Sequence, residues 1–530
     1  MNPRLQATWI ENILFGALLL LAAAIIALPF VGMALPLLSI HWFSDAGTAK
    51  IFSFSVRQMG LLARSVLFSA LVAAGTSAIG AALAIILIRS KSGKKILALI
   101  LPPLIVVPPA IHGINWTATT MTAGEWLSRH GLIAAQPGGW LAAGFAEMLS
   151  FLPIAIAIAW AGFAMLDTRL LEAGIIYRPE SAVLSGIAVQ LAMPVLLSGA
   201  GVMFLLSLSD YAVPSLFSVN VYALEIFSAY STGIHPAAAV FTAAPLVAII
   251  AATLIAVLSI GRRVQAMAMS RNASSSASVE FADRVNMAVA IVLLIYVFFP
   301  LAVMAATAGS FRSLVAAASG ARSEIGVTIA ISLCAAALCI LLGLPVGRAL
   351  DKNGPVSGVL WVLVCLAFAL PAPLIGIGLV QIGGFFGSWF EEFLPVWAST
   401  ARFLPIAAFV SFAMHRRAES ALIEAGCVFA HSRLHALLRV TLPLMLPGVA
   451  ISGATCFAFT MGELGATLLV AAPGHATLMM RLYNLLHYGA SGEVASLCLL
   501  LALPALATGL FLSVILHQRA AKITMESGNV

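Results

Sequence analysis

Charged residues are scarce in this sequence: Asp, Glu, Lys and Arg make up 9% of its 530 residues, whereas 62% are hydrophobic. Soluble domains carry about 25% charged residues, so the composition excludes an ordinary soluble protein. Apolar runs of about 18 residues or more, each long enough to span a membrane as a helix, recur along the whole length. The net charge of +7 is therefore not interpreted as a nucleic-acid-binding surface.

The sequence also lacks the short motifs of nucleotide-binding and catalytic sites. It contains no G-x-x-x-x-G-K-[ST] phosphate loop; the most similar string, SGKK at 92–95, lacks the leading Gly and the hydroxyl residue. H-E-x-x-H, G-x-S-x-G and clusters of metal-ligating residues are absent as well. We therefore expect no enzyme activity, no cofactor and no metal bound by this chain.

Cysteine is used sparingly and without the spacing of a redox or zinc site. The six cysteines form no C-x-x-C pair, and all lie in the second half, within apolar runs or a basic segment. We expect them to be small buried hydrophobes. The first apolar run, from about residue 12 to 38, has no clear cleavage site after a short apolar core, so it predicts a retained helix.

The apolar runs predict an all-α membrane protein with twelve spans, both chain ends in the cytoplasm and most of the 27 Lys and Arg residues on the cytoplasmic side. The predicted spans lie near 12–38, 62–88, 96–116, 140–164, 194–217, 236–260, 285–308, 325–346, 357–380, 397–414, 447–471 and 494–516.

The Ser- and Ala-rich stretch 261–284 divides these spans six and six and predicts a cytoplasmic linker between two halves, 1–260 and 285–530. The halves resemble each other. Three residues of the first half match three of the second at a constant offset of 263, namely Gly80, Pro108 and Gly113 with Gly343, Pro371 and Gly376. Because both halves begin on the same side, we interpret them as parallel six-helix repeats.

A polar, basic segment at 416–448 interrupts the second half. Central arginines cost about 2.5–3.5 kcal/mol each to bury in lipid, so the segment is expected on the cytoplasmic side as a short amphipathic helix. It resembles the EAA loop of permease subunits of ATP-binding cassette (ABC) importers, whose motif is Glu-Ala-Ala, a Gly six residues after the Glu, then Ile-x-Leu-Pro. The residues that carry this resemblance are Glu424, Ala425, Gly426, Ala430 (in place of Gly), Val440, Leu442 and Pro443.

A second, degenerate copy of the motif lies at 166–194 in the first half. Glu172, Ala173 and Gly174 fit, but Arg178 occupies the Gly position and the Leu-Pro ending is not in register. We expect this loop to be shaped differently and to hold its partner less typically.

The resemblance implies a type I ABC importer permease in the bacterial inner membrane and a set of partners. Two copies of a separate ATPase, acting with ATP and Mg, would each hold one EAA helix in a groove, and an external binding protein would deliver the substrate. Glu172 and Glu424 would anchor the helices, Gly174 and Gly426 would allow close approach, and Leu442 with Pro443 would fix the return into the membrane. Motion of the ATPases would then turn the two halves against each other.

Three carboxylates are predicted within the spans, where ionisable residues are expensive and functional by default. Asp210 and Glu463 each lie 16 residues after a proline, about 24 Å along a helix. They are expected to face a substrate pathway near its outer end and to favour a cationic substrate, or alternatively to hydrogen-bond between helices. Glu147 has no equivalent in the second half, and we expect it to form interhelical hydrogen bonds.

Two proline pairs are predicted to break the third and ninth spans, either for gating or for packing: Pro108 with Pro109, and Pro371 with Pro373. His112, on the same stretch, is expected to make a satisfied polar contact and not to bind a metal.

The resemblance also indicates candidate cargoes. Fused twelve-span permeases resemble ferric-iron and thiamine importers, and the string at 462–500 looks most similar to the iron-type branch, so ferric iron is the first expectation. Thiamine, polyamine and phosphonate uptake stay open. A secondary transporter with six-plus-six parallel repeats is the alternative of another class; it would need no ATPase. A structural membrane scaffold is disfavoured by the repeated cytoplasmic helix.

Overall fold

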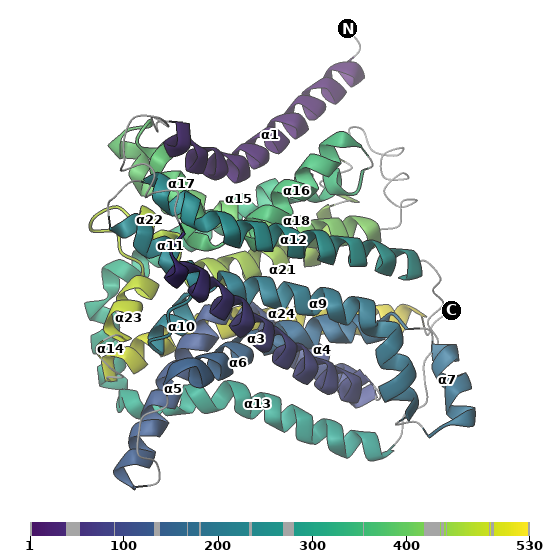
Figure 1. Ribbon diagram of the computed structural model, residues 1–530. Helices are drawn as coiled ribbons and strands as arrows, with labels where there is room; N and C mark the ends of the chain where they lie inside the picture. Colours follow the sequence, from purple (N-terminus) through teal and green to yellow (C-terminus); the bar gives the residue numbers. More distant parts are fainter. Residues whose placement is uncertain are drawn as a thin grey trace. The chain divides into compact units, whose positions relative to one another are not determined.

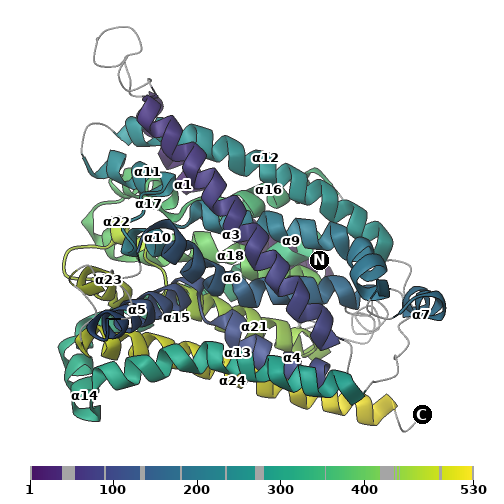
Figure 2. The same cartoon turned by 60° about the horizontal axis from the view of Figure 1, so that its bottom comes forward.

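The computed structural model describes residues 3–38, 54–88, 91–131, 138–166, 168–179, 182–232, 236–268, 280–352, 354–417, 435, 439–440, 442–486, 488 and 492–527. All regular elements in these ranges are helical, as the apolar composition predicts (Figures 1 and 2).

The helices of the first half are α1 (Pro3–Leu38), α3 (Val56–Ile88), α4 (Lys91–Val106), α5 (Pro109–Arg129), α6 (Gly139–Ala164), α7 (Thr168–Tyr177), the π-helix η1 (Val183–Ala188), α9 (Val189–Ser209), α10 (Ala212–Leu216), α11 (Tyr222–Ser231) and α12 (Pro236–Ala268). Those of the second half are α13 (Glu280–Ala308), α14 (Phe311–Gly320), α15 (Arg322–Leu350), α16 (Pro355–Ala369), α17 (Ala372–Gly383), the 3-10 helix η2 (Ser388–Phe393), α18 (Leu394–Arg417), α21 (Leu442–Met461), α22 (Thr467–Val470), α23 (Leu478–Leu486) and α24 (Gly492–Ser527).

The predicted all-α membrane class is confirmed, and the candidate spans follow the predicted order. Within the described ranges, 10 helices are long and apolar enough to cross a membrane, or 12 if each of two bent helix pairs counts as one span. The bent pairs correspond to the predicted third and ninth spans. Leu99–Val106 and α5 meet at 88°, and α16 and α17 meet at 109°.

The two bends confirm the breaks predicted from proline. Pro108 precedes α5 with φ −58° and ψ 143°, and Pro371 precedes α17 with φ −56° and ψ 135°. These extended conformations end one helix, and the following helix begins with proline in its first turn, where the missing N–H costs nothing.

The chain forms two compact units, and each combines segments from both halves of the sequence. Unit 1 comprises Met1–Ser53, Ala229–Phe241 and Ala321–Arg481, and unit 2 comprises Phe54–Ser228, Thr242–Gly320 and Leu482–Val530. The first helix of each half thus belongs to the unit whose core comes from the other half. The repeat boundaries drawn from the sequence stay a prediction.

Unit 1 is built around α15, α18 and α21, which contact one another, with α1 packed on α15, α16 and α17. The backbones of α1 and α17 approach closely at two glycines. A Cβ atom on Gly378 would lie 1.8 Å from the Pro29 carbonyl oxygen, and one on Gly32 would lie 2.0 Å from the Gly378 oxygen. Small residues permit such close helix contacts in membranes.

Unit 2 is built around α3, α6 and α9, with α5 on α6, and α4 and α13 on α24. Figure 2 shows α13 and α24 side by side. The contact between α4 and α24 is close: a Cβ on Gly509 would lie 2.3 Å from Pro103 Cα, and the Ser513 hydroxyl donates a hydrogen bond to the Leu99 carbonyl oxygen at 2.9 Å.

Equivalent contacts recur inside the two units at the glycines that the sequence repeat matches. Gly80 on α3 lies against Ala155 of α6, and Gly343 on α15 lies against Ala407 of α18. Their hypothetical Cβ atoms would be 2.8 and 2.6 Å from the alanine Cβ atoms. This shared contact supports the predicted repeat and aligns α6 with α18 residue by residue.

Candidate coupling segments and membrane carboxylates

The first predicted coupling segment forms the short helix α7, which stands apart from the long helices of unit 2 in both views (Figures 1 and 2). Its apolar side chains are exposed: Ile176 is 77% and Tyr177 86% accessible. Exposed apolar groups on a helix outside the spans are typical of a docking surface. Ala173 is exposed on the same helix, and the side chain of Glu172 lies outside the described residues.

Gly174 serves a contact within the chain. A Cβ at this position would lie 3.1 Å from Val183 Cγ1 and 3.2 Å from Ile187 Cδ1, both on η1. The glycine therefore lets α7 lie against the π-helix that leads into α9. The Arg178 N–H donates to the Gly174 oxygen at 3.0 Å at the end of the helix.

The second coupling segment is described only at its end. Glu424, Ala425, Gly426 and Ala430 lie outside the described residues, whereas Leu442 begins α21 and Pro443 follows in its first turn. Proline is compatible with a first turn. That Leu442 and Pro443 fix the return into the membrane stays a prediction.

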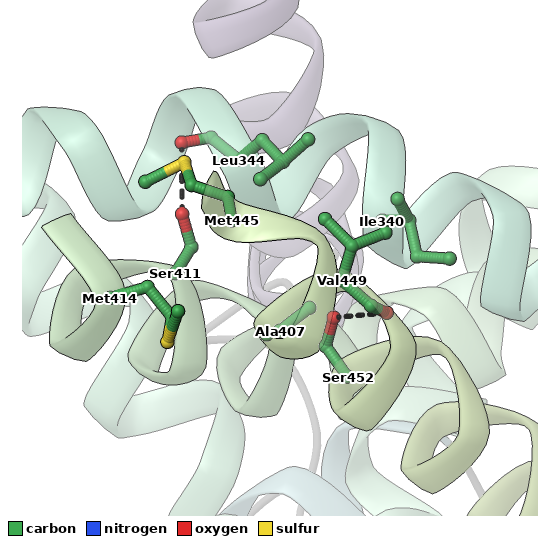
Figure 3. Close-up of a pocket in the computed structure, with 9 residues that line it drawn as sticks. Ile340, Leu344, Ala407, Ser411, Met414, Met445, Val449 and Ser452 are labelled. Atoms are coloured by element: carbon green, nitrogen blue, oxygen red, sulfur yellow. Dashed lines mark hydrogen bonds between the residues drawn. The ribbon is translucent and has the colours of Figure 1, made fainter. Parts of the chain in front are cut away.

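A small pocket lies beside the start of α21, between α15, α18 and α21 (Figure 3). Its polar groups are already bonded to backbone. The Ser411 hydroxyl donates to the Leu344 oxygen at 3.2 Å, and the Ser452 hydroxyl donates to the Val449 oxygen at 3.1 Å. Met414 and Met445 line the rest, and their flexible side chains suit a joint that changes shape.

Glu463 is buried and neutralised by an arginine. It is 4% exposed, and Arg402 Nη1 of α18 lies 3.0 Å from its Oε2 and 3.1 Å from its Oε1. Glu463 Oε1 also accepts a hydrogen bond from the Ala466 N–H at 2.8 Å, and Thr467 Oγ1 donates to the Glu463 backbone oxygen at 2.9 Å. The carboxylate therefore stabilises the non-helical turn between α21 and α22.

Arg402 was missed by sequence reasoning, although a signal was present. It lies in the predicted span 397–414, and an arginine inside a span needs a partner. The carboxylate that α21 delivers at its end is that partner.

Asp210 occupies the corresponding place in unit 2. α9 ends at Ser209, Asp210 follows with ψ 135°, and its Oδ1 accepts the Ala212 N–H at 2.9 Å. The predicted spans 194–217 and 447–471 are therefore too long, because each helix breaks at its carboxylate. Asp210 lies in unit 2 and Glu463 in unit 1, and their place along a substrate pathway stays a prediction.

Glu147 on α6 is 0% exposed, and neither of its carboxyl oxygens makes a hydrogen bond of standard geometry with the described residues. A hydrogen bond between its carboxyl and the Ser207 hydroxyl of α9, which would join two helices as the sequence predicts, nevertheless contributes to the electrostatics of Glu147. Asp210 lies within electrostatic range of Glu147, and Ser207 of α9 lies beside it.

His112 makes the satisfied polar contacts that the sequence predicts. Its Nε2 is 3.2 Å from the Leu104 oxygen, a carbonyl in the last turn before the break, and Tyr296 Oη is 3.4 Å from its Nδ1. Among the residues described, no group of three or more His, Cys, Asp or Glu side chains is placed to hold a metal ion.

Hydroxyl caps hold the short helices α11 and α23 in the same way. Ser65 Oγ of α3 accepts the Tyr222 N–H at 2.8 Å, and Thr328 Oγ1 of α15 accepts the Leu478 N–H at 2.8 Å. The positions of Ser65 and Thr328 are 263 residues apart, which is the offset of the sequence repeat. The repeat could therefore have identified both caps from the sequence.

An ion pair accompanies each of these caps, and the acidic and basic partners are exchanged between the two units. In unit 2, Arg57 of α3 pairs with Glu225 of α11; in unit 1, Glu324 of α15 pairs with Arg481 of α23 at 2.8 Å. Burial and the neighbouring Glu225 carboxylate raise the pKa of Tyr222 to about 12, so its hydroxyl keeps its proton and donates to the Thr242 oxygen at 2.7 Å.

Ten to twelve candidate spanning helices among the described residues define a multi-pass membrane protein. No protein-family profile matches the chain. Over 181 residues it is 30% identical to the putative 2-aminoethylphosphonate transport system permease protein PhnV of Salmonella typhimurium. The aligned residues make up 33% of this chain and 67% of that protein. Over 164 residues it is 32% identical to the molybdenum transport system permease protein ModB of Mycobacterium tuberculosis, covering 28% of this chain and 62% of that protein.

The chain therefore belongs to the family of ABC importer permeases. Membership implies an inner-membrane location and, in general, an ATPase subunit and a substrate-binding protein as partners. It also accounts for the absence of a phosphate loop from the sequence.

Proposed function

We propose that this chain is the complete membrane pathway of a binding-protein-dependent importer, with two permease repeats fused in one polypeptide. One ATPase copy docks on α7 and a second docks on the segment at 416–448. ATP and Mg act on those ATPases, and this chain binds no cofactor. Both chain ends lie in the cytoplasm. The exposed apolar end of α7 is the observation that carries this proposal. Its apolar side chains lie outside the candidate spans and are accessible, so a partner protein could bury them.

We propose a role for each of the coupling residues. Ile176 and Tyr177 supply apolar contact with the ATPase groove, and Glu172 and Glu424 supply polar anchors. Gly174 keeps α7 against η1, so that a push on the helix reaches α9. Asp210 terminates that helix at its far end.

A pair of tyrosines provides a matched test of the docking surface. Tyr177 on α7 is 86% exposed, and Tyr488, which follows α23, is 91% exposed. We expect Tyr177→Ser with Ile176→Ser to reduce ATPase copurification and ATP-dependent uptake at least fivefold, while Tyr488→Ser leaves ATPase copurification unchanged. Equal effects at the two sites would contradict docking on α7. Uptake that persists without ATPase or ATP would favour the secondary-transporter alternative.

For the cargo, we propose a phosphonate as the leading candidate, because several of the most similar relatives carry 2-aminoethylphosphonate in their names. Ferric iron, the first expectation from the sequence, is the second candidate; it rests on the likeness of 462–500 to the iron-type branch. The Arg402–Glu463 ion pair weakens the case for a cationic metal cargo, because Glu463 is already neutralised.

Vesicles containing the permease, its ATPase and its binding protein would separate these cargoes. Labelled 2-aminoethylphosphonate should accumulate with ATP, and excess ferric iron, molybdate, thiamine or polyamine should not compete. Accumulation of iron with no phosphonate uptake would overturn the phosphonate proposal and leave the permease assignment intact.

A further inference from the structure

Two basic side chains of unit 1 lie over the same aromatic ring of α1. The guanidinium carbon of Arg348 is 5.8 Å from the centre of the Phe15 ring, and Lys352 Nζ is 5.4 Å from the same centre. Arg348 lies in the last turn of α15, and Lys352 follows four residues later, just past the end of the helix. A cation this close to a ring face is attracted by its π-electrons. The ring therefore holds two like charges close together, although they repel each other.

No carboxylate among the described residues neutralises this pair. Arg348 and Lys352 are both exposed, and neither forms an ion pair with a described residue. Asp351 lies between them in the sequence, but its carboxylate pairs at 3.4 Å with Nε of Arg416, at the end of α18. Because Arg416 neutralises Asp351, the two cations over Phe15 leave this surface with a positive net charge.

Three candidate spans place these cations at the boundary of the membrane. Arg322–Leu350 and Phe390–Arg416 end here, and Asn12–Leu38 begins here. Side chains at the ends of spans lie at the depth of the lipid headgroups, outside the hydrocarbon. This placement depends only on the span ends and not on the orientation of the chain in the membrane. The cations therefore lie where lipid phosphates lie.

The same part of α1 carries an exposed apolar face. Two pairs of residues, each seven positions apart and so two turns apart, share that face: Ile13 with Leu20, and Leu14 with Leu21. Their side chains are between 47% and 74% exposed. An exposed apolar face on a candidate span contacts acyl chains in a bilayer. A ligand that matches both surfaces has an anionic headgroup and apolar chains.

We propose that Arg348 and Lys352, aligned by Phe15, bind the phosphate of an anionic phospholipid whose acyl chains lie along α1. Guanidinium and ammonium groups donate charge-assisted hydrogen bonds to phosphate oxygens. Basic clusters at the ends of spans attract anionic lipids in this way. α1 comes from one half of the sequence and α15 from the other, so the bound lipid stabilises a contact between the two halves within unit 1.

The test uses the purified full-length chain in dodecyl maltoside, titrated with phosphatidylglycerol or with phosphatidylcholine of the same acyl chains. A ligand that binds the folded state raises the melting temperature in a saturable way, and native mass spectrometry counts the lipids bound. We expect phosphatidylglycerol to stabilise the wild type and phosphatidylcholine not to do so. Arg348→Gln with Lys352→Gln should weaken phosphatidylglycerol binding at least tenfold.

Two double variants separate loss of the site from a general effect on the fold. Arg312→Gln with Arg322→Gln removes two exposed arginines at the starts of α14 and α15, and it should leave phosphatidylglycerol binding unchanged. Arg348→Lys with Lys352→Arg keeps both charges over the ring and should retain binding to within a few-fold.

Four outcomes would overturn the proposal. The first two are equal phosphatidylglycerol binding by wild type and the double glutamine variant, and equal binding of the two lipids by wild type. Saturation by inorganic phosphate alone, with the same loss in the double glutamine variant, would assign the site to a free anion. Loss of ATPase copurification from that variant, with lipid binding unchanged, would assign the surface to a protein contact.

Discussion

Replacing Arg402 by methionine removes the charge that neutralises a buried carboxylate while keeping a long apolar side chain. Arg402 Nη1 lies 3.0 Å from Glu463 Oε2, and the two side chains are 30% and 3% exposed. Removing one partner of a buried ion pair costs about 3–5 kcal/mol, because the remaining charge is left uncompensated. Partial exposure of Arg402 weakens the pair, so we expect a loss near the lower end, about 3 kcal/mol.

Removing the charge of Glu463 instead of that of Arg402 should lower the stability less. Glu463→Gln keeps an amide oxygen that can accept the Ala466 N–H, and the arginine it leaves behind is partly exposed and can be hydrated. Loss of one such hydrogen-bonded ion contact is worth about 1–2 kcal/mol. The double variant leaves no unpaired charge, so it should be more stable than Arg402→Met alone. The resulting interaction free energy is about 2 kcal/mol.

Unfolding of the purified protein by heat or by titration with SDS would measure these differences. Arg416, which pairs with Asp351 at 3.4 Å with side chains 52% and 39% exposed, provides the control. Arg416→Met should cost less than about 1 kcal/mol, as surface ion pairs do. If Arg402→Met were as stable as wild type, or if the losses of the two single variants simply added, the ion pair would not hold α18 to the end of α21.

Three further outcomes follow from the contacts of the helices. Arg481→Glu should loosen α23 and lower stability by about 1 kcal/mol, and adding Glu324→Arg should restore most of it, as read by thermal unfolding. Gly378→Ala should lower the yield of folded protein sharply, because its Cβ would meet the Pro29 oxygen at 1.8 Å, whereas Gly384→Ala, with open space around it, should behave like wild type. Finally, the two halves expressed as separate chains divided at the linker should be stable only together; a half that is monodisperse and protease-resistant alone would contradict this.

The architecture could be predicted because lipid imposes a simple rule on the sequence. Each spanning helix needs about 20 apolar residues, and each proline pair inside a run removes a hydrogen bond from the helix. Those signals gave the spans and both sharp bends, and the structure confirms them at Pro108 and Pro371. The rule depends only on local composition, so it needs no knowledge of tertiary contacts.

The electrostatic partners could not be predicted in the same way. Arg402 and Glu463 are 61 residues apart, and the sequence alone does not indicate that a break after α21 would turn the carboxylate toward α18. Gly174 was expected to allow close approach at the partner's groove, yet a Cβ at this position would meet Val183 and Ile187 of η1. Where each carboxylate pairs depends on helix ends, and the apolar runs predicted these ends several residues too late.

The composition of the two units has a consequence for how the chain folds. In unit 1 the Trp397 Nε1–H donates to the Ile25 oxygen of α1 at 2.9 Å, and in unit 2 the Tyr296 hydroxyl of α13 donates to the Leu149 oxygen at 2.6 Å. Each bond joins the first helix of one half to the core of the other half. A half that folded alone would leave its buried donor or acceptor unsatisfied, at about 1–3 kcal/mol per group, and would expose the helix face that its counterpart covers. The two halves are therefore expected to complete each other's cores, and a single chain keeps both halves present at equal amounts when those contacts form.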